Sequence, residues 1–210
     1  QATRDRVQPA GQPLRPNLVG AIVGGLGIAQ RALQPEHALR TLQRVEAFLV
    51  PHGPRAEAAL TRAFDAMRSG PDEDPTLDVE GRALTARRRA GSAIWFDFAA
   101  LCDGPRSQRD YLELARRFAV VFLSDIPVMS LQQGDLARRF TWLVDILYDH
   151  RVKLVASAAA AAEALYPAGP NAQEFPRTVS RLAEMRTRDY MALPHAAGNV
   201  RVPEPQSIPA

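Results

Sequence analysis

Two short apolar runs, each followed by small polar or acidic residues, dominate the hydrophobic pattern of the chain. Residues 120–123 form the first run, before Ser124 and Asp125, and residues 152–156 form the second, before Ser157. Between them, residues 134–150 carry apolar side chains at helical spacing, over a length that suits a crossover between parallel strands. The pattern therefore predicts a parallel βαβ unit whose sheet is covered on both faces.

The carboxyl ends of these two predicted strands are the first place to look for function. In open parallel sheets, ligands bind beyond the carboxyl ends of the strands. Asp125 would then serve as a metal-binding acid and Ser157 as a polar sensor of a bound ligand. Structural roles are the alternative: Asp125 would cap the strand end or make a surface contact, and Ser157 would hydrogen-bond to the backbone.

The remaining periodicity predicts the elements around this unit. Residues 77–98 favour one β-hairpin with its turn near residues 90–92, and residues 39–50 favour a strand. Helices are expected over residues 55–69, from Ser107 to Phe118, over the alanine-rich residues 158–165, and from Pro176 onward. The predicted fold class is α/β, with the βαβ unit, a flanking hairpin and C-terminal helices.

Composition divides the chain into one structured region and two ends. Residues 1–36 are expected to be a loop or a divergent junction, residues 37–193 the structured region, and residues 194–210 a disordered tail rich in proline. The chain begins at Gln1 rather than Met, so we expect it to be a fragment or a trimmed or processed product. No apolar run reaches the roughly 20 residues that a membrane-spanning helix needs, so no transmembrane segment is expected.

Charge and cysteine content exclude some classes of function. The net charge of +3 is spread among 26 basic and 23 acidic residues, with Lys153 as the only lysine, so no nucleic-acid partner is expected. The single cysteine, Cys102, cannot form an internal disulfide and fits a reducing compartment. The four histidines have no ligand spacing with each other or with Cys102, so no metal site is expected.

Arginines in two of the predicted helices are the strongest candidates for binding an anion. Arg177 and Arg181 are one helical turn apart, so both guanidinium groups can reach a single phosphate or carboxylate. The alternative is a solvated, ion-paired face, in which Glu184 is the neighbouring acid. Arg138 and Arg139 open the crossover helix, where a cation opposes the helix dipole, and this favours an acidic partner.

A series of short motifs, in order and without a large gap, resembles the ZapE-type, AFG-one-like ATPase family. It extends from about Ala38 to Met191. The matching motifs are Gly81–Leu84, Trp95–Phe98, Leu101–Cys102, Pro105–Gln108, Asp110–Leu112, Ala137–Phe140, Leu143–Asp145, Leu147–Asp149, Val152–Leu154, Phe175, Arg177–Thr178, Ser180–Leu182 and Glu184–Met185.

The resemblance implies an AAA-type P-loop ATPase fold and, for the whole protein, ATP and Mg²⁺ as cofactors. It implies a cytoplasmic protein linked to cell division or to membrane-associated quality control. The implied partners are the upstream ATPase half, a neighbouring subunit and cell-division proteins. Arg177, Arg181, Arg138 and Arg139 would then contact the nucleotide or the neighbouring subunit.

The phosphate loop of such an ATPase is missing from these residues. It requires the pattern Gly-x-x-x-x-Gly-Lys-Ser/Thr, and residues 23–30 offer the glycines without the lysine or the hydroxyl. We therefore expect no catalytic residue in this chain, and no cofactor or ATP hydrolysis for the chain alone. It would shape the nucleotide site or a subunit interface. The alternative is a non-catalytic interaction module that recruits a partner through its arginine-bearing faces.

Overall fold

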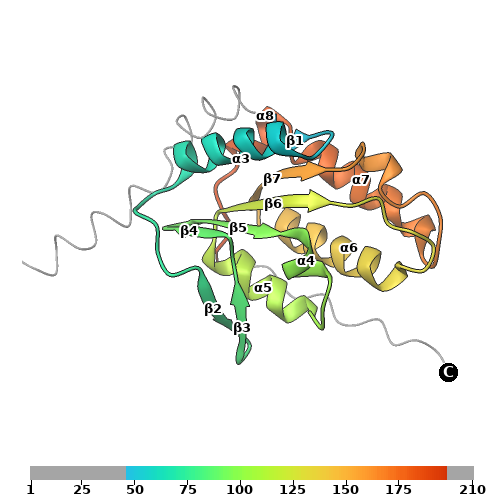
Figure 1. The fold of residues 1–210 in the computed structure, drawn as a ribbon, viewed down its shortest axis with the longest axis horizontal. Helices are drawn as coiled ribbons and strands as arrows, with labels where there is room; N and C mark the ends of the chain where they lie inside the picture. Colours follow the sequence, from blue (N-terminus) through green and yellow to red (C-terminus); the bar gives the residue numbers. More distant parts are fainter. Residues whose placement is uncertain (1–45, 198–210) are drawn as a thin grey trace, which may run out of the picture. The chain divides into compact units, whose positions relative to one another are not determined.

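The computed structural model describes residues 46–197, so the predicted junction over residues 1–36 lies outside the described part. A five-stranded sheet forms its centre (Figure 1), in the order β1 (Phe48–Leu49), β7 (Lys153–Ala158), β6 (Val120–Ile126), β5 (Ala93–Asp97) and β4 (Arg88–Ala90). The first four strands are parallel and β4 is antiparallel to β5. The α/β class is confirmed, as is the parallel β6–α6–β7 unit, with α6 at Gly134–Asp149.

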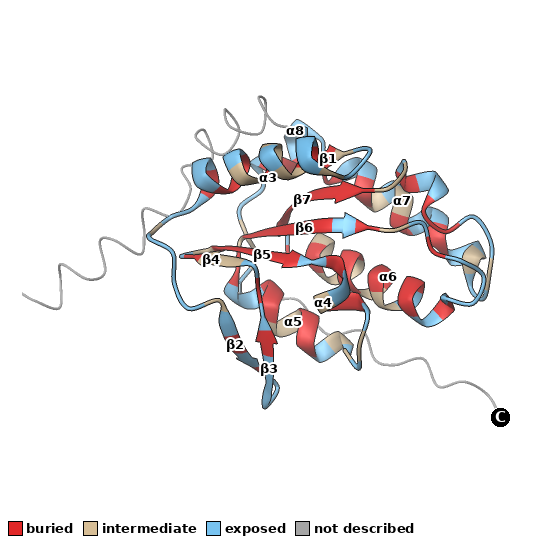
Figure 2. Cartoon of the chain, viewed as in Figure 1, coloured by how far each residue is buried: buried red, intermediate tan, exposed pale blue. Residues whose placement is uncertain are grey.

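Helices cover both faces of this sheet. Helix α3 (Pro54–Met67) packs on one face, where Leu60 and Phe64 meet Trp95 and Phe122. On the other face lie the short α4 (Phe98–Cys102), α5 (Gln108–Arg117), α6 and α7 (Phe175–Glu184). The central strands are therefore buried almost throughout (Figure 2), which explains their continuous apolar runs.

The predicted single hairpin over residues 77–98 is wrong, because two hairpins share this segment. Strands β2 (Thr76–Val79) and β3 (Arg82–Thr85) form a separate two-stranded sheet. Their turn places both Glu80 and Gly81 at positive φ, 51° and 72°, as a two-residue hairpin loop requires. The predicted turn near residues 90–92 belongs to the second hairpin, β4–β5.

The predicted helix over residues 158–165 is also wrong, although alanine is the best helix former. Strand β7 continues to Ala158, which pairs with Ile126, and only Ala162–Ala164 form a 3₁₀ turn. The backbone at the start of this run makes tertiary hydrogen bonds instead of helical ones. The carbonyl of Ala158 accepts from the amide of His52 at 2.7 Å, and the amide of Ala159 donates to the carbonyl of Ile126 at 2.8 Å. Tertiary hydrogen bonds therefore override the local propensity.

The ends of two other helices follow the sequence signals closely. Helix α5 begins after Ser107, which forms a capping box with Asp110, and α7 carries Pro176 in its first turn. A separate short helix, α8 (Arg188–Ala192), follows α7 and is capped by Thr187. No helix among residues 46–197 is long and apolar enough to cross a membrane.

Lys153 fastens the C-terminal segment to the amino end of β7. Its side chain is buried, and its ammonium group donates to the carbonyls of Arg151, Tyr190 and Leu193 at 3.1, 2.9 and 2.8 Å. Of the predicted tail, residues 194–197 are described, and His195 lies within hydrogen-bond distance of the Ala115 carbonyl, 2.7 Å away. The rest of the tail lies outside the described residues.

Candidate functional site

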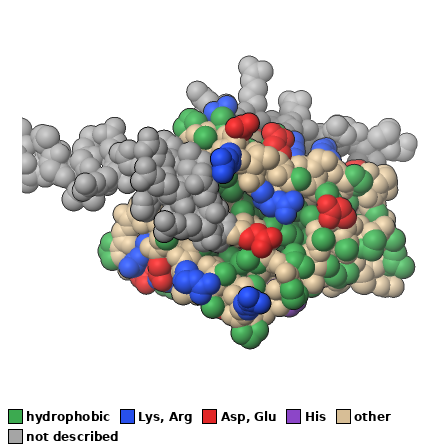
Figure 3. Space-filling model, turned by 90° about the horizontal axis from the view of Figure 1, so that it is seen from above, with side chains coloured by type: hydrophobic (Ala, Val, Ile, Leu, Met, Phe, Trp, Pro, Cys, Tyr) green, Lys and Arg blue, Asp and Glu red, His purple; other side chains and the backbone are tan. Residues whose placement is uncertain are grey.

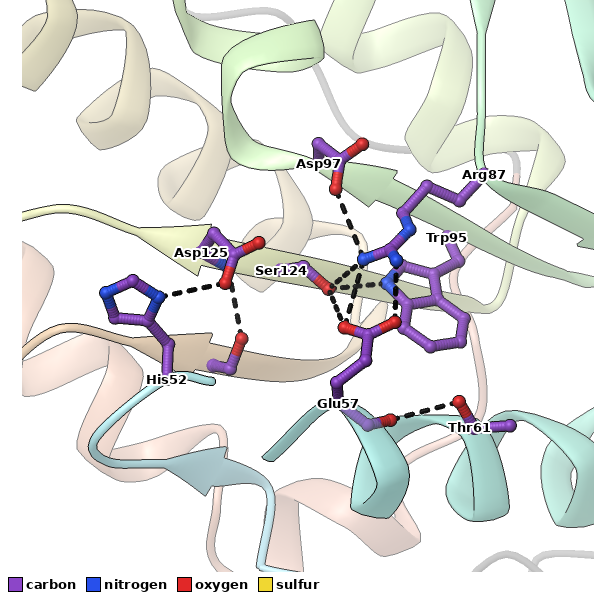
Figure 4. A network of polar contacts seen from close by, with 9 residues as sticks. His52, Glu57, Thr61, Arg87, Trp95, Asp97, Ser124 and Asp125 are labelled. Atoms are coloured by element: carbon purple, nitrogen blue, oxygen red, sulfur yellow. Dashed lines mark hydrogen bonds and ion pairs between the residues drawn. The ribbon is translucent and has the colours of Figure 1, made fainter. Parts of the chain in front are cut away.

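Polar side chains converge at the carboxyl ends of the parallel strands (Figure 4). Ser124 and Asp125 lie just before the last residue of β6, Asp97 is the last residue of β5, and Ser157 lies near the end of β7. His52 follows β1, so four neighbouring strands contribute to one edge. We call this set of residues, together with Glu57 and Arg87, the carboxyl-edge cluster.

Arg87 is the centre of the first half of the cluster. Both terminal nitrogens of the Arg87 guanidinium group donate to the carboxylate of Glu57, in the first turn of α3, at 2.6 and 3.0 Å. A carboxylate oxygen of Asp97 lies 3.2 Å from one of these nitrogens. The guanidinium also lies 4.9 Å from the ring centre of Trp95. The buried Ser124 hydroxyl accepts from Arg87 at 3.1 Å and from the Trp95 indole at 2.8 Å. Arg87 is thus fixed in place by two carboxylates and an aromatic face.

Asp125 and His52 form the second half. Asp125 has a positive φ of 63°, at a register shift between β6 and β7, so its side chain is turned out of the regular strand. Its backbone amide donates to the buried Ser157 hydroxyl at 3.0 Å, and its carboxylate lies 3.0 Å from Nδ1 of His52. Asp125 and Ser157, which the sequence places at two strand ends, therefore meet in the structure. Ser157 has the backbone-bonding role that was one of its two predicted alternatives.

The cluster does not fit a divalent cation. Mg²⁺ is bound by carboxylates and other oxygen ligands, yet within residues 46–197 no three side chains of His, Cys, Asp or Glu come together as a ligand set. Glu57 and Asp97 both use Arg87 as their counter-ion. The described residues therefore offer no Mg²⁺ site, and we assign no metal-dependent step to them.

Four arginines predicted as site residues lie on or beside α6 and α7, in different environments. Arg177 donates to Asp145 at 2.7 Å, and Arg181 also pairs with Asp145 and lies 3.6 Å from Asp149. One carboxylate thus receives both guanidinium groups, as their helical spacing allows. This carboxylate, Asp145, is on α6. The acid expected to pair with the arginines, Glu184, accepts a hydrogen bond from the hydroxyl of Tyr148 instead.

Exposure separates these two arginines. The side chain of Arg181 is 23% exposed and lies over the ring of Tyr148, 4.9 Å from its centre, while that of Arg177 is 57% exposed. Asp149, beside Arg181, has its pKa raised by burial although the guanidinium group opposes this. Arg181 therefore holds α7 against α6, and Arg177 presents its guanidinium group to solvent.

The other pair shows the same division. Arg139 donates from Nε to the carbonyl of Cys102 at 2.6 Å and connects α6 to α4. Arg138 is 47% exposed, and its ion pair is with the exposed Asp135 at 2.7 Å. A small hollow between α6 and the start of α7 brings Arg138 and Arg177 together. We call it the arginine hollow; its walls include Trp142, Tyr166, Asn171 and Phe175.

Cys102 offers no chemistry in this setting. Its side chain is fully buried in α4, and burial raises the pKa of its thiol to about 12. A thiol with that pKa stays protonated near neutral pH and is a poor nucleophile. It packs as a small core residue.

Sequence reasoning missed His52, Glu57 and Arg87. Glu57 and Arg87 are 30 residues apart, and His52 and Asp125 are 73 apart, so no local spacing connects them. The run of three arginines at residues 87–89 was the available signal, because such a run beside predicted strands requires nearby acids.

Comparisons with known proteins agree on one family. The AFG1-like ATPase family model matches residues 34–194. Cell division protein ZapE of Escherichia coli (strain K12) is 36% identical over 78% of this chain, and lactation elevated protein 1 homolog B of Danio rerio is 33% identical over 68%. An uncharacterized protein of Schizosaccharomyces pombe, C115.02c, is 35% identical over 60%.

These matches cover only part of each relative. The matched residues make up 44% of the Escherichia coli protein, 35% of the Danio rerio protein and 28% of the Schizosaccharomyces pombe protein. The chain thus spans less than half the length of the curated relatives it matches. No solved structure matches the chain.

Proposed function

Because this chain belongs to the AFG1-like ATPase family, we propose that it is the C-terminal part of a cytoplasmic ATPase linked to cell division. In this proposal ATP and Mg²⁺ are held by a phosphate loop elsewhere in the protein, since the pattern Gly-x-x-x-x-Gly-Lys-Ser/Thr does not occur in these 210 residues. The chain does not hydrolyse ATP by itself. Its task is to contribute arginines to the nucleotide site or to the interface with a neighbouring subunit.

The arginine hollow is the observation that carries this proposal. Arg138 and Arg177 reach it from two helices, and both side chains are about half exposed. Arg138 pairs with Asp135, and Arg177 pairs with Asp145. A guanidinium group has five N–H donors, so most of the donors of each arginine remain for a ligand. Negative charge builds up on the phosphoryl oxygens during transfer, and a positioned guanidinium group stabilises it.

Steady-state ATP turnover of the full-length protein tests this role. Arg138→Gln combined with Arg177→Gln should lower kcat about tenfold or more, because transition-state charge loses its partners. Arg62→Gln is the matched control: it removes an exposed arginine from α3, on the opposite face of the sheet. Turnover within twofold of wild type in the double variant would contradict the proposal.

A second candidate function is the interaction module without a catalytic contribution. The hollow favours it in one respect, because the partly exposed indole of Trp142 lies beside the arginines and aromatic surface of this kind suits a peptide. In that case the double variant keeps its ATP turnover and loses binding of an acidic peptide. The two functions therefore predict opposite results in the same pair of measurements.

A further inference from the structure

Exposed hydrophobic side chains gather at one edge of the sheet. Among the described residues, the large hydrophobics with high exposure are Val50, Val128, Leu131 and Leu193, at 45, 49, 56 and 40%. Val50 directly follows β1, and Val128 and Leu131 lie on the loop between β6 and α6. Three of the four are thus at the carboxyl ends of the strands. Figure 3 shows hydrophobic side chains at the surface of the end toward which the strands point.

The loop after β6 is held in place, so this exposure is not a matter of a loosely packed segment. Met129, between the two exposed residues, is buried, and its amide donates to the carbonyl of Leu165 at 2.7 Å. The amide of Ser130 donates to the side chain of Gln133 at 2.8 Å. Apolar residues that are grouped at one edge and held toward solvent by a fixed loop are typical of an interaction surface.

The charge at this edge is opposite to that of the chain. The carboxyl-edge cluster contains the carboxylates of Glu57, Asp97 and Asp125, against the single guanidinium group of Arg87 and the imidazole of His52. The whole chain has a net charge of +3. Asp97 and Asp125 are about half exposed, so this negative charge is accessible to a partner.

Chain geometry places the acidic and apolar groups within reach of one ligand. Val50 is two residues from His52, and Val128 is three residues from Asp125, so their Cα atoms lie at most about 7 Å and about 11 Å apart, respectively. The ion pair uses only Oδ1 of Asp125, and among the described residues no hydrogen bond reaches Oδ2. We propose that this edge is the docking surface for a basic segment of a partner protein, whose apolar side chains cover Val50, Val128 and Leu131.

Charge complementarity selects this occupant over others. An arginine or lysine of the partner can pair with the free oxygen of Asp125 in a charge-assisted hydrogen bond. An acidic segment would be repelled by the same carboxylates. The surface therefore discriminates by sign as well as by hydrophobicity, and none of its residues lines the arginine hollow on which the proposed function rests.

Two fluorescent peptides supply the test, one of alternating Leu and Arg and one of alternating Leu and Glu. Their binding to the whole chain is measured by fluorescence anisotropy at physiological salt. The Leu/Arg peptide should bind about tenfold or more tightly than the Leu/Glu peptide. The net positive charge of the chain would favour the opposite order, so this preference is diagnostic of the acidic edge.

Variants locate the binding. Two variants should each weaken binding of the Leu/Arg peptide about fivefold or more: the double variant Val128→Ser, Leu131→Ser and the single variant Asp125→Asn. Two matched controls lie on or next to α8: Leu193→Ser removes another exposed hydrophobic and Asp189→Asn another exposed carboxylate, and both should change binding less than about twofold. All these side chains are exposed, so the fold should survive, which circular dichroism checks.

The other outcomes overturn the proposal. Equal binding of the two peptides, no binding of either, or equal effects of the edge and control variants would each remove it. Sedimentation velocity tests whether a second copy of the chain occupies the edge instead. A dimer that disappears in the Val128→Ser, Leu131→Ser variant would show this and overturn the proposal.

Discussion

Removing Arg181 should destabilise the fold, whereas removing Arg177 should hardly affect it, although both pair with Asp145. Arg181 is 23% exposed, and its partners Asp145 and Asp149 are 18% and 35% exposed. Losing a partly buried pair costs more than losing a surface pair, about 1–2 kcal/mol here. The contact with the Tyr148 ring adds about 0.5–1 kcal/mol. We therefore expect Arg181→Ala to cost about 1.5–3 kcal/mol.

Arg177 makes a surface pair. Its side chain is 57% exposed, and Asp145 keeps Arg181 as a counter-ion when Arg177 is removed. Exposed ion pairs contribute about 0–1 kcal/mol, so Arg177→Ala should cost about 0.5 kcal/mol. The difference between the two variants should thus be about 2 kcal/mol.

Urea unfolding followed by circular dichroism at equilibrium measures both costs. With a slope of about 2 kcal/mol per molar urea, Arg181→Ala should lower the midpoint by about 1 M and Arg177→Ala by about 0.3 M. Equal shifts, or a larger shift for Arg177→Ala, would refute the division into a structural and an exposed arginine. That result would also remove the reason for assigning function to Arg177 rather than to Arg181.

Three further predictions concern buried polar groups. Burial lowers the pKa of Lys153 to about 8, below its usual 10.5, so the unfolded chain binds more protons between pH 8 and pH 10. Stability measured by urea unfolding should therefore rise with pH in that window, and Lys153→Met should remove the rise. Ser124→Ala should cost about 1–3 kcal/mol in the same assay and shift the fluorescence of Trp95, whose indole N–H loses its acceptor. Burial raises the pKa of Asp110, but hydrogen bonds from Ser107 and Arg82 outweigh it and hold that pKa below its usual value. Thermal stability should therefore fall as the pH drops below about 4, and it should fall less in the Asp110→Asn variant.

Local signals in the sequence were sufficient for the elements that local interactions determine. The apolar runs predict β6 and β7 because strands covered on both faces are continuously apolar. Ser107 as an N-cap predicts the start of α5, and the structure adds its capping-box partner Asp110 within one turn. These parts of the fold follow directly from neighbouring residues.

Interactions between distant residues were beyond the same reasoning. Helical spacing predicts that Arg177 and Arg181 can share one anion, but their partner Asp145 lies 32 residues before Arg177. Glu184, the neighbouring acid that the sequence suggested, accepts from the hydroxyl of Tyr148 instead. The predicted helix over residues 158–165 is wrong for the same reason. The backbone of Ala158 and Ala159 bonds to His52 and Ile126, which are distant in sequence.

The central claim is that these residues supply arginines to an ATPase whose phosphate loop lies elsewhere. Phosphate release from ATP, measured side by side for the 210-residue chain and for the full-length protein, tests it most directly. We predict release by the full-length protein and none above buffer by the chain alone. Turnover of ATP by the isolated chain would contradict the claim.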